Sequence, residues 1–186
     1  MRLSAKEIFT IPNCLSFLRI ILLPIFVIFY IQAKEPEDYL LPTLIIFISA
    51  ISDLLDGFIA RTFNQVTELG KAIDPVADKL QQAAIVFCLL FRYDQMIPLV
   101  ILFVVKELFM GINGLILLRK GKKLDGAMWF GKVSTAVFYL CMLSLLAFPN
   151  LEEKWVNLFI SITGFFLALS FLLYIPVYVK LYQQPK

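Results

Sequence analysis

The stretch that organises this chain covers residues 53–78 and reads DLLDGFIARTFNQVTELGKAIDPVAD. It contains four aspartates, Asp53, Asp56, Asp74 and Asp78, in a chain that is otherwise mostly apolar. Spacings of three and four residues put both members of each pair on one face of a helix. Carboxylates are costly in apolar surroundings unless they are paired, protonated or bound to a cation. The leading explanation for this group is therefore a metal site.

The rest of the chain has the composition of an integral membrane protein. Of its 186 residues, 60% are apolar, and the mean hydropathy of +0.84 is well above that of soluble domains. The chain contains no histidine, which is the commonest metal ligand and general base. An ion bound by oxygen atoms, such as Mg²⁺, Mn²⁺ or Ca²⁺, is therefore favoured over zinc.

Six apolar stretches are each close to the ~20 residues that a membrane-spanning helix needs. We predict spans over residues 13–32, 40–61, 70–91, 95–118, 131–149 and 154–181. The connections between them are short and polar, and residues 1–12 have the pattern of a short interfacial helix. The sequence predicts an all-α polytopic membrane protein with six transmembrane helices, forming a single domain over residues 1–186.

The distribution of basic residues predicts the orientation of these spans. Eleven Lys and Arg residues lie on the side that holds both termini, against three on the other side. Because cytoplasmic loops are enriched in Lys and Arg, both termini should be cytoplasmic. Asp53 and Asp78 then each lie eight residues, or roughly 12 Å, from the cytoplasmic end of their span. Asp56 and Asp74 lie roughly 6–8 Å from it, so two levels of paired carboxylates form a candidate di-metal site.

The spacing of the whole stretch is D-x2-D-G-x2-A-R-x8-G-x3-D-x3-D. Its fixed positions are Asp53, Asp56, Gly57, Ala60, Arg61, Gly70, Asp74 and Asp78. This pattern resembles the signature of the CDP-alcohol phosphatidyltransferase family. The segments TIPNCLSFLRIILLPIF and LGKAIDPVADK are similar to those of bacterial phosphatidylglycerophosphate synthases within that family.

The resemblance implies a reaction and a set of site residues. A phosphatidyl group would pass from CDP-diacylglycerol to an alcohol, most simply glycerol 3-phosphate, with release of CMP. Two Mg²⁺ or Mn²⁺ ions would be held by the four aspartates, and Asp78 would also be the catalytic base. The CDP group would lie against Asp56, Gly57, Ala60, Arg61 and Gly70. The resemblance further implies a homodimer in the bacterial cell (inner) membrane, with the site open to the cytoplasm.

Four basic residues are candidates for binding an acceptor phosphate: Arg19, Lys106, Arg119 and Lys132. Arg19 lies inside the first span and needs an anionic partner there, which is either a substrate phosphate or one of the aspartates. The similar synthases tend to carry further basic residues at the positions of Gly114 and Ser134. Their absence here keeps open a cardiolipin synthase that uses phosphatidylglycerol as acceptor. A cation-coupled transporter with an acidic site at the membrane midplane is the alternative from another class.

Overall fold

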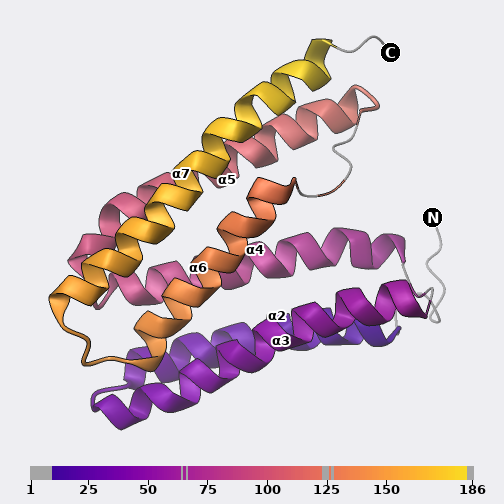
Figure 1. Cartoon of the computed structure of the whole chain (residues 1–186). Coiled ribbons are helices and arrows are strands. Elements are labelled where there is room, and N and C mark those ends of the chain that lie inside the picture. The colour runs from indigo at the N-terminus through magenta and orange to yellow at the C-terminus, as the bar shows by residue number, and fades with distance from the viewer. Residues whose placement is uncertain (1–9, 64, 66, 123–125, 127, 184–186) are drawn as a thin grey trace. The chain divides into compact units, whose positions relative to one another are not determined.

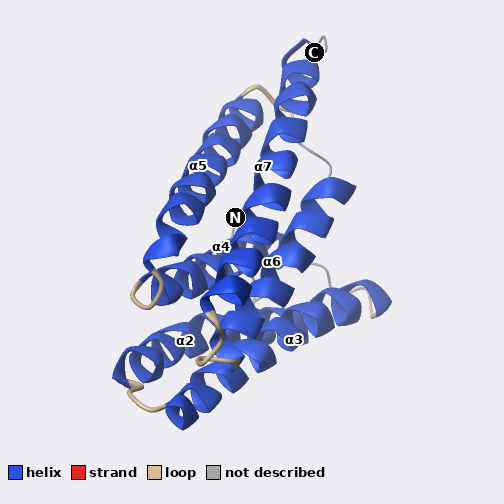
Figure 2. Cartoon of the chain, turned by 60° about the vertical axis from the view of Figure 1, so that its left-hand side comes forward, coloured by secondary structure: helices blue, strands red, loops and turns tan. Residues whose placement is uncertain are grey.

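The computed structural model describes residues 10–63, 65, 67–122, 126 and 128–183, without the side chains of residues 54, 61 and 71. Long α-helices account for most of this part of the chain (Figures 1 and 2). In chain order they are α2 (Ile11–Gln32), α3 (Leu40–Thr62), α4 (Glu68–Leu90), α5 (Ile97–Arg119), α6 (Trp129–Ala147) and α7 (Glu153–Gln183). Two short 3-10 helices, η1 (Pro36–Tyr39) and η2 (Asp94–Met96), precede α3 and α5. The predicted all-α class is confirmed.

The first helix begins slightly earlier than the sequence suggested. Ile11 and Pro12 form the first turn of α2, two residues ahead of the predicted span. Thr10 is the N-cap, and its hydroxyl accepts the backbone N–H of Asn13 at 3.5 Å. Proline is favoured in this first turn because its missing N–H would have no helical partner anyway. The interfacial helix predicted at the N-terminus falls on residues 1–9, which lie outside the described part.

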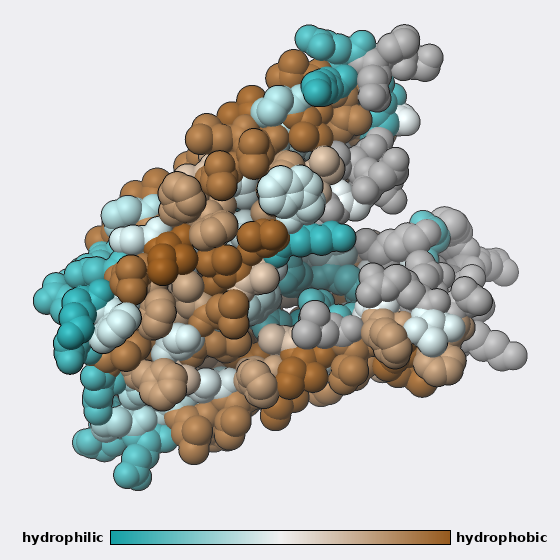
Figure 3. Space-filling model, viewed as in Figure 1, coloured by the Kyte–Doolittle hydropathy of each residue, from teal (hydrophilic) through white to brown (hydrophobic). Residues whose placement is uncertain are grey.

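Five described segments are long and apolar enough to cross a membrane. They are Ile11–Gln32, Pro36–Ala60, Asp94–Arg119, Trp129–Ala147 and Glu153–Gln183. Figure 3 shows apolar side chains along the visible sides of the helices and hydrophilic ones near their ends. The chain is thus a multi-pass membrane protein. At 23 residues α4 is also long enough, but Lys71, Asp74, Asp78 and Lys79 make its first half highly charged. A sixth span through α4 therefore stays a prediction.

The chain falls into two compact units. The first holds α2, α3 and α4, and α2 packs along α3. On α2 one stripe is buried, including Ser16, Arg19, Leu23 and Phe26, while Leu18, Ile21, Ile25 and Ile28 are exposed on the other side. An exposed apolar stripe suits contact with lipid. The buried stripe is polar near the N-terminus of α2 and apolar further along. Its polar groups therefore lie next to the second half of α3 and the first half of α4.

The second unit contains α5, α7 and most of α6. Aromatic rings pack α5 against α7, with the ring of Phe109 5.2 Å from that of Phe171 and 5.6 Å from that of Tyr178. Leu117, Phe130, Tyr174 and Tyr178 form a buried apolar cluster. Ring packing therefore contributes to the contact of α5 with α7, and the hydroxyl of Tyr178 bonds the carbonyl oxygen of Met110.

Candidate active site

The aspartates of the motif lie on facing sides of α3 and α4. On α3, Asp53, Asp56, Gly57 and Ala60 follow the i, i+3, i+4, i+7 spacing of one helix face. On α4, Gly70, Asp74 and Asp78 follow each other at intervals of four. Asp56 is six residues from the end of α3, and Asp74 is six from the start of α4. Both are therefore about 9 Å along their helices from the connecting loop.

The structure adds a third wall to the site, contributed by α2. Asn13, Ser16 and Arg19 are spaced by three residues, and all three side chains are buried. Side chains three apart share a helix face, so these groups form a polar strip directed at α3 and α4. Of the three, the sequence analysis singled out only Arg19. A signal for the strip was present, because polar residues at a spacing of three are unusual within an apolar span.

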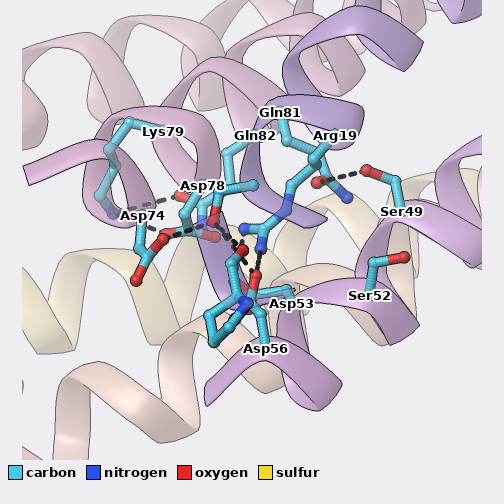
Figure 4. Close-up of polar contacts among 12 residues, drawn as sticks. Arg19, Ser49, Ser52, Asp53, Asp56, Asp74, Asp78, Lys79, Gln81 and Gln82 are labelled. Carbon is cyan, nitrogen blue, oxygen red and sulfur yellow. Dashed lines mark hydrogen bonds and ion pairs between the residues drawn. The ribbon is translucent and has the colours of Figure 1, made fainter. Parts of the chain in front are cut away.

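Arg19 is the central cation of this site (Figure 4). One guanidinium nitrogen, Nη1, bonds Asp53 Oδ1, and the other, Nη2, bonds Asp56 Oδ2. Arg19 is completely buried, and the side chain of Asp56 is only 4% exposed, whereas that of Asp53 is 37% exposed. In this structure the partners of Arg19 are these two carboxylates, and its predicted role at an acceptor phosphate stays a prediction. The two ion pairs also leave Asp53 as the member of the pair that faces outward.

Ser16 joins the two helices that carry the aspartates. Its Oγ lies 2.5 Å from Asp74 Oδ1 and 3.4 Å from Asp56 Oδ2, and also 3.1 Å from the carbonyl oxygen of Pro12. One hydroxyl within reach of both carboxylates shows that Asp56 and Asp74 lie at the same level, as the spacing predicted. Ser16 was missed because a single serine in an apolar span is usually bonded to its own helix.

Asp78 is held by neighbours on its own helix. Nε2 of Gln82 lies 3.3 Å from both carboxylate oxygens of Asp78, and Nζ of Lys79 lies 3.8 Å from Oδ2. Lys79 Nζ also donates to Gln82 Oε1 at 3.3 Å. The partners of Asp78 thus include an amide and a cation of its own helix, while Asp53 and Asp56 share a buried guanidinium. The carboxylate of Asp78 remains 23% exposed, which suits a group that exchanges protons.

A second polar contact joins α3 to α4 further from the loop. Ser49 donates its hydroxyl hydrogen to Gln81 Oε1 at 2.9 Å, and both residues are fully buried. The amide nitrogen of Gln81 has no hydrogen-bond partner among the described residues. Neither residue was singled out from the sequence, since a lone serine or glutamine in an apolar helix is a weak signal. The bond stabilises one register of α3 against α4.

The glycine at position 70 has a structural reason as well as a predicted binding role. A Cβ added there would lie 2.7 Å from Asn13 Oδ1 and 3.1 Å from Thr67 Oγ1. The Thr67 hydroxyl donates to Asn13 Oδ1 at 3.1 Å and accepts the backbone N–H of Gly70 at 2.9 Å. Close approach of α2 therefore requires a small residue at this position.

The remaining residues of the predicted CDP site are described only in part. Gly57 and Ala60 are half-buried on the same face of α3 as the aspartates. The backbone of Arg61 belongs to the last turn of α3, but its side chain lies outside the described residues. The contact of these residues with a nucleotide stays a prediction.

The other three candidates for an acceptor phosphate belong to the second unit. Lys106 is buried on α5, and its Nζ pairs with Glu107 Oε1 at 2.8 Å. Arg119 ends α5 and is exposed, and Lys132 is exposed on α6. Thirteen residues of helix separate Lys106 from Arg119, or about 20 Å along the axis. These two side chains are therefore too far apart to bind a single phosphate together.

The donor set of the first unit fits a hard divalent cation. All four predicted ligands are carboxylates, which suit Mg²⁺ and Mn²⁺, and two of them already hold a positive charge on Arg19. Among the described residues, no three acidic or cysteine side chains gather closely enough to hold one ion together. Three of the carboxylates are linked instead through Arg19 and Ser16, with Asp56 in contact with both, while Asp78 contacts Gln82. The ligand assignment of the four aspartates stays a prediction.

Comparison with known proteins places this site in a family. A family model described as CDP-alcohol phosphatidyltransferase matches residues 9–176, which include the whole motif. A Salmonella typhimurium protein named CDP-diacylglycerol–glycerol-3-phosphate 3-phosphatidyltransferase is 34% identical over 166 residues, covering 86% of this chain and 87% of the relative. Proteins of that name from Escherichia coli and Aquifex aeolicus are 32% and 31% identical, over 86% and 73% of this chain and 87% and 74% of their own lengths. The chain therefore belongs to the CDP-alcohol phosphatidyltransferase family.

Proposed function

We propose that this protein transfers the phosphatidyl group of CDP-diacylglycerol to glycerol 3-phosphate and releases CMP, which makes it a phosphatidylglycerophosphate synthase. The observation that carries the proposal is the complete aspartate motif on the facing sides of α3 and α4. The choice of glycerol 3-phosphate is supported by the names of the relatives, which match 73–86% of the chain.

Asp53, Asp56, Asp74 and Asp78 would hold two divalent ions, Mg²⁺ or Mn²⁺. Bound ions would neutralise the negative charge of the diphosphate and of the departing CMP. The protein's own part is to present carboxylates from two helices at matched levels and to keep water from the surrounding helix contacts. The 37% exposure of the Asp53 side chain leaves this edge of the site accessible.

Asp78 would act as the general base. Its carboxylate accepts the proton of the acceptor hydroxyl while that oxygen forms a bond to the phosphorus of the phosphatidyl group. The bond from this phosphorus to the CMP oxygen breaks, and CMP leaves with the electron pair. A chain without histidine needs another base, and a partly exposed carboxylate that is oriented by the Gln82 amide is suited to that role.

Gly57, Ala60 and Gly70 would let the CDP group approach the two helix backbones, with Arg61 contacting a phosphate at the end of α3. The predicted basic residues for the acceptor are Arg19, Lys106, Arg119 and Lys132, of which Arg19 is bonded to two aspartates in this structure. Since Lys106 and Arg119 cannot share a phosphate, the acceptor phosphate would bind to one of them, with or without Lys132. The site would open toward the cytoplasm, with both termini on that side, in a homodimer in the bacterial cell membrane.

A second acceptor, phosphatidylglycerol, is favoured by two positions. Gly114, where similar synthases tend to have an arginine, has open space around its Cα, and Ser134 replaces a further basic residue. Both changes lower the positive charge available for a phosphate monoester. A chain using this acceptor would be a cardiolipin synthase.

One experiment separates these acceptors and tests the reaction itself. Purified protein is incubated with CDP-diacylglycerol and Mg²⁺, and separately with glycerol 3-phosphate, phosphatidylglycerol, serine or inositol phosphate, and CMP is measured. We expect CMP release with glycerol 3-phosphate, its loss in EDTA, and its recovery on adding Mg²⁺ or Mn²⁺. Release only with phosphatidylglycerol would identify the cardiolipin synthase. No CMP with any acceptor would favour the transporter, and activity unaffected by EDTA would exclude the two-ion site.

A further inference from the structure

We propose that Arg19 is an internal cation that competes with the divalent ions for Asp53 and Asp56, and thereby sets the metal affinity of the site. The inference rests on the proposed function, because it concerns the carboxylates assigned there as metal ligands. It gives Arg19 a positioning role in place of the predicted role in binding an acceptor phosphate.

The carboxylates of Asp53 and Asp56 are already occupied by a cation. Arg19 bonds one oxygen of Asp53 and one of Asp56 through two different nitrogens, so its guanidinium spans the pair. A divalent ion between the same carboxylates would share these oxygens or lie beside the guanidinium. At a separation of about 4 Å and an effective dielectric constant near 20, two like charges repel by several times the thermal energy. Metal binding and the double ion pair therefore oppose each other.

Burial makes Arg19 depend on these carboxylates. Arg19 has no exposed surface, and a buried ionised side chain is strongly unfavourable without a partner. Asp56 is likewise buried, so the pair neutralises both charges when no metal ion is bound. The guanidinium thus keeps the site folded without metal, and the same contact weakens the affinity for the ion that replaces it.

The double ion pair leaves the guanidinium of Arg19 incompletely bonded. Nε of Arg19 is buried and has no hydrogen-bond acceptor among the described residues. A buried donor without an acceptor is destabilising. The double ion pair therefore holds the guanidinium at the cost of one unsatisfied donor, which lowers the free energy needed to exchange Arg19 for a divalent ion at these carboxylates.

The test measures metal binding directly, without turnover. Purified protein is titrated with Mn²⁺, and the unbound ion is followed by its electron paramagnetic resonance signal. We expect Arg19→Gln to bind Mn²⁺ about tenfold more tightly than the wild type, within the usual range of coupling between two bound groups. Arg92→Gln is the matched control. It removes one arginine charge from the second unit, where Arg92 lies over the ring of Tyr93, and it should leave the affinity unchanged.

Folding of the variant is checked by its helix content and by a single symmetric peak in size-exclusion chromatography. If Arg19→Gln does not fold, Arg19→Lys decides the question. Lysine keeps the charge but lacks the planar fork that bonds both carboxylates, so its Mn²⁺ affinity should lie between those of the wild type and the glutamine variant. An affinity in the folded variants equal to or weaker than that of the wild type would overturn the competition.

Failure of this inference can be told apart from failure of the proposed function. If the wild type binds Mn²⁺ and releases CMP but the Arg19 variants bind Mn²⁺ no more tightly, only the role of Arg19 is wrong. If the wild type binds no Mn²⁺, the two-ion assignment is wrong and the role of Arg19 falls with it. A lower melting temperature of Arg19→Gln in EDTA, restored by Mn²⁺, would further support the exchange of one cation for the other.

Discussion

The two units bury different chemistry in their helix contacts. In the first unit the contacts of α2 with α3 and α4 bury Arg19, Asp56 and Ser16, and the charges are balanced within the contact. In the second unit the contact of α5 with α7 is mostly aromatic, and Tyr178 donates its hydroxyl hydrogen to the carbonyl oxygen of Met110 at 3.3 Å. A buried charge is costly and an aromatic contact is not. The first unit thus gathers its buried charges in contacts between helices, whereas the buried charge of the second unit, Lys106, is paired with its neighbour Glu107 on the same helix.

The largest effect is expected from removing one charge of the first unit. Asp78→Asn should lower the rate of CMP release by 100-fold or more, in the usual range for a lost general base (~10²–10⁴), because an amide does not accept the proton of the acceptor. The measurement is the initial rate of CMP release from CDP-diacylglycerol. Asp94→Asn, at the start of η2 in the second unit, is the matched control and should retain activity. An active Asp78→Asn enzyme with unchanged helix content would remove Asp78 from the role of base.

The next effect concerns Gly70, where two explanations of the glycine can be separated. An added Cβ would meet the tip of the Asn13 side chain at 2.7 Å. The strain is about 1 kcal/mol, at the low end for an added methyl group, and the higher helix propensity of alanine offsets about the same amount. Gly70→Ala should therefore leave the free energy of unfolding nearly unchanged. If CDP lies against this glycine, the KM for CDP-diacylglycerol should rise about tenfold, or 1.4 kcal/mol.

The control for Gly70→Ala is Gly111→Ala on α5, where a new Cβ has nothing within 4 Å. It should leave KM unchanged and stabilise the helix by up to about 1 kcal/mol. If Gly70→Ala loses stability while its KM stays the same, the glycine serves the close approach of α2 and not the binding of CDP.

In the second unit Gly131 faces the ring of Tyr174. A Cβ on Gly131 would overlap the Tyr174 hydroxyl, with the ring atoms Cζ and Cε2 at 3.2 and 3.3 Å. The hydroxyl of Tyr174 also accepts the backbone N–H of Met128, so the ring has little freedom to move. Gly131→Ala should be destabilised by about 1 kcal/mol after the gain in helix propensity is subtracted. Melting in detergent measures this, and Tyr174→Phe in the same chain should recover part of the loss.

The sequence predicted the helices well because each is an apolar run of nearly the length needed to cross a membrane. The last predicted span, 154–181, differs from α7 by only one residue at its start and two at its end. Counting residues alone also predicted that Asp56 and Asp74 lie at the same level. Each is six residues from the loop that joins α3 to α4. The exception to this apolar pattern is α4, because the acidic residues that it carries lower its mean hydropathy.

The partners of the polar side chains were much harder to predict. Residue spacing gives the face of a helix but not its rotation against a neighbour, so Arg19 had two possible partners and the sequence left both open. Lys106 illustrates the same limit, since its bond to Glu107 depends on side-chain conformation and not on spacing. The bond of Ser49 to Gln81 was invisible for a further reason: the two residues are 32 positions apart and neither belongs to the motif.

The smallest effects come from removing single hydroxyls, and their order tests whether the two units differ as described. Tyr178→Phe should lower the free energy of unfolding by about 0.6 kcal/mol, an average value for a hydrogen bond between membrane helices. Ser49→Ala should cost more, about 1 kcal/mol, because it leaves the amide of Gln81 fully buried and the nitrogen of that amide already lacks a partner. Both are measured by denaturation of the purified protein in detergent. Equal losses, or a larger loss for Tyr178→Phe, would show that the polar contacts of the first unit are no more sensitive to a missing partner than the aromatic contacts of the second.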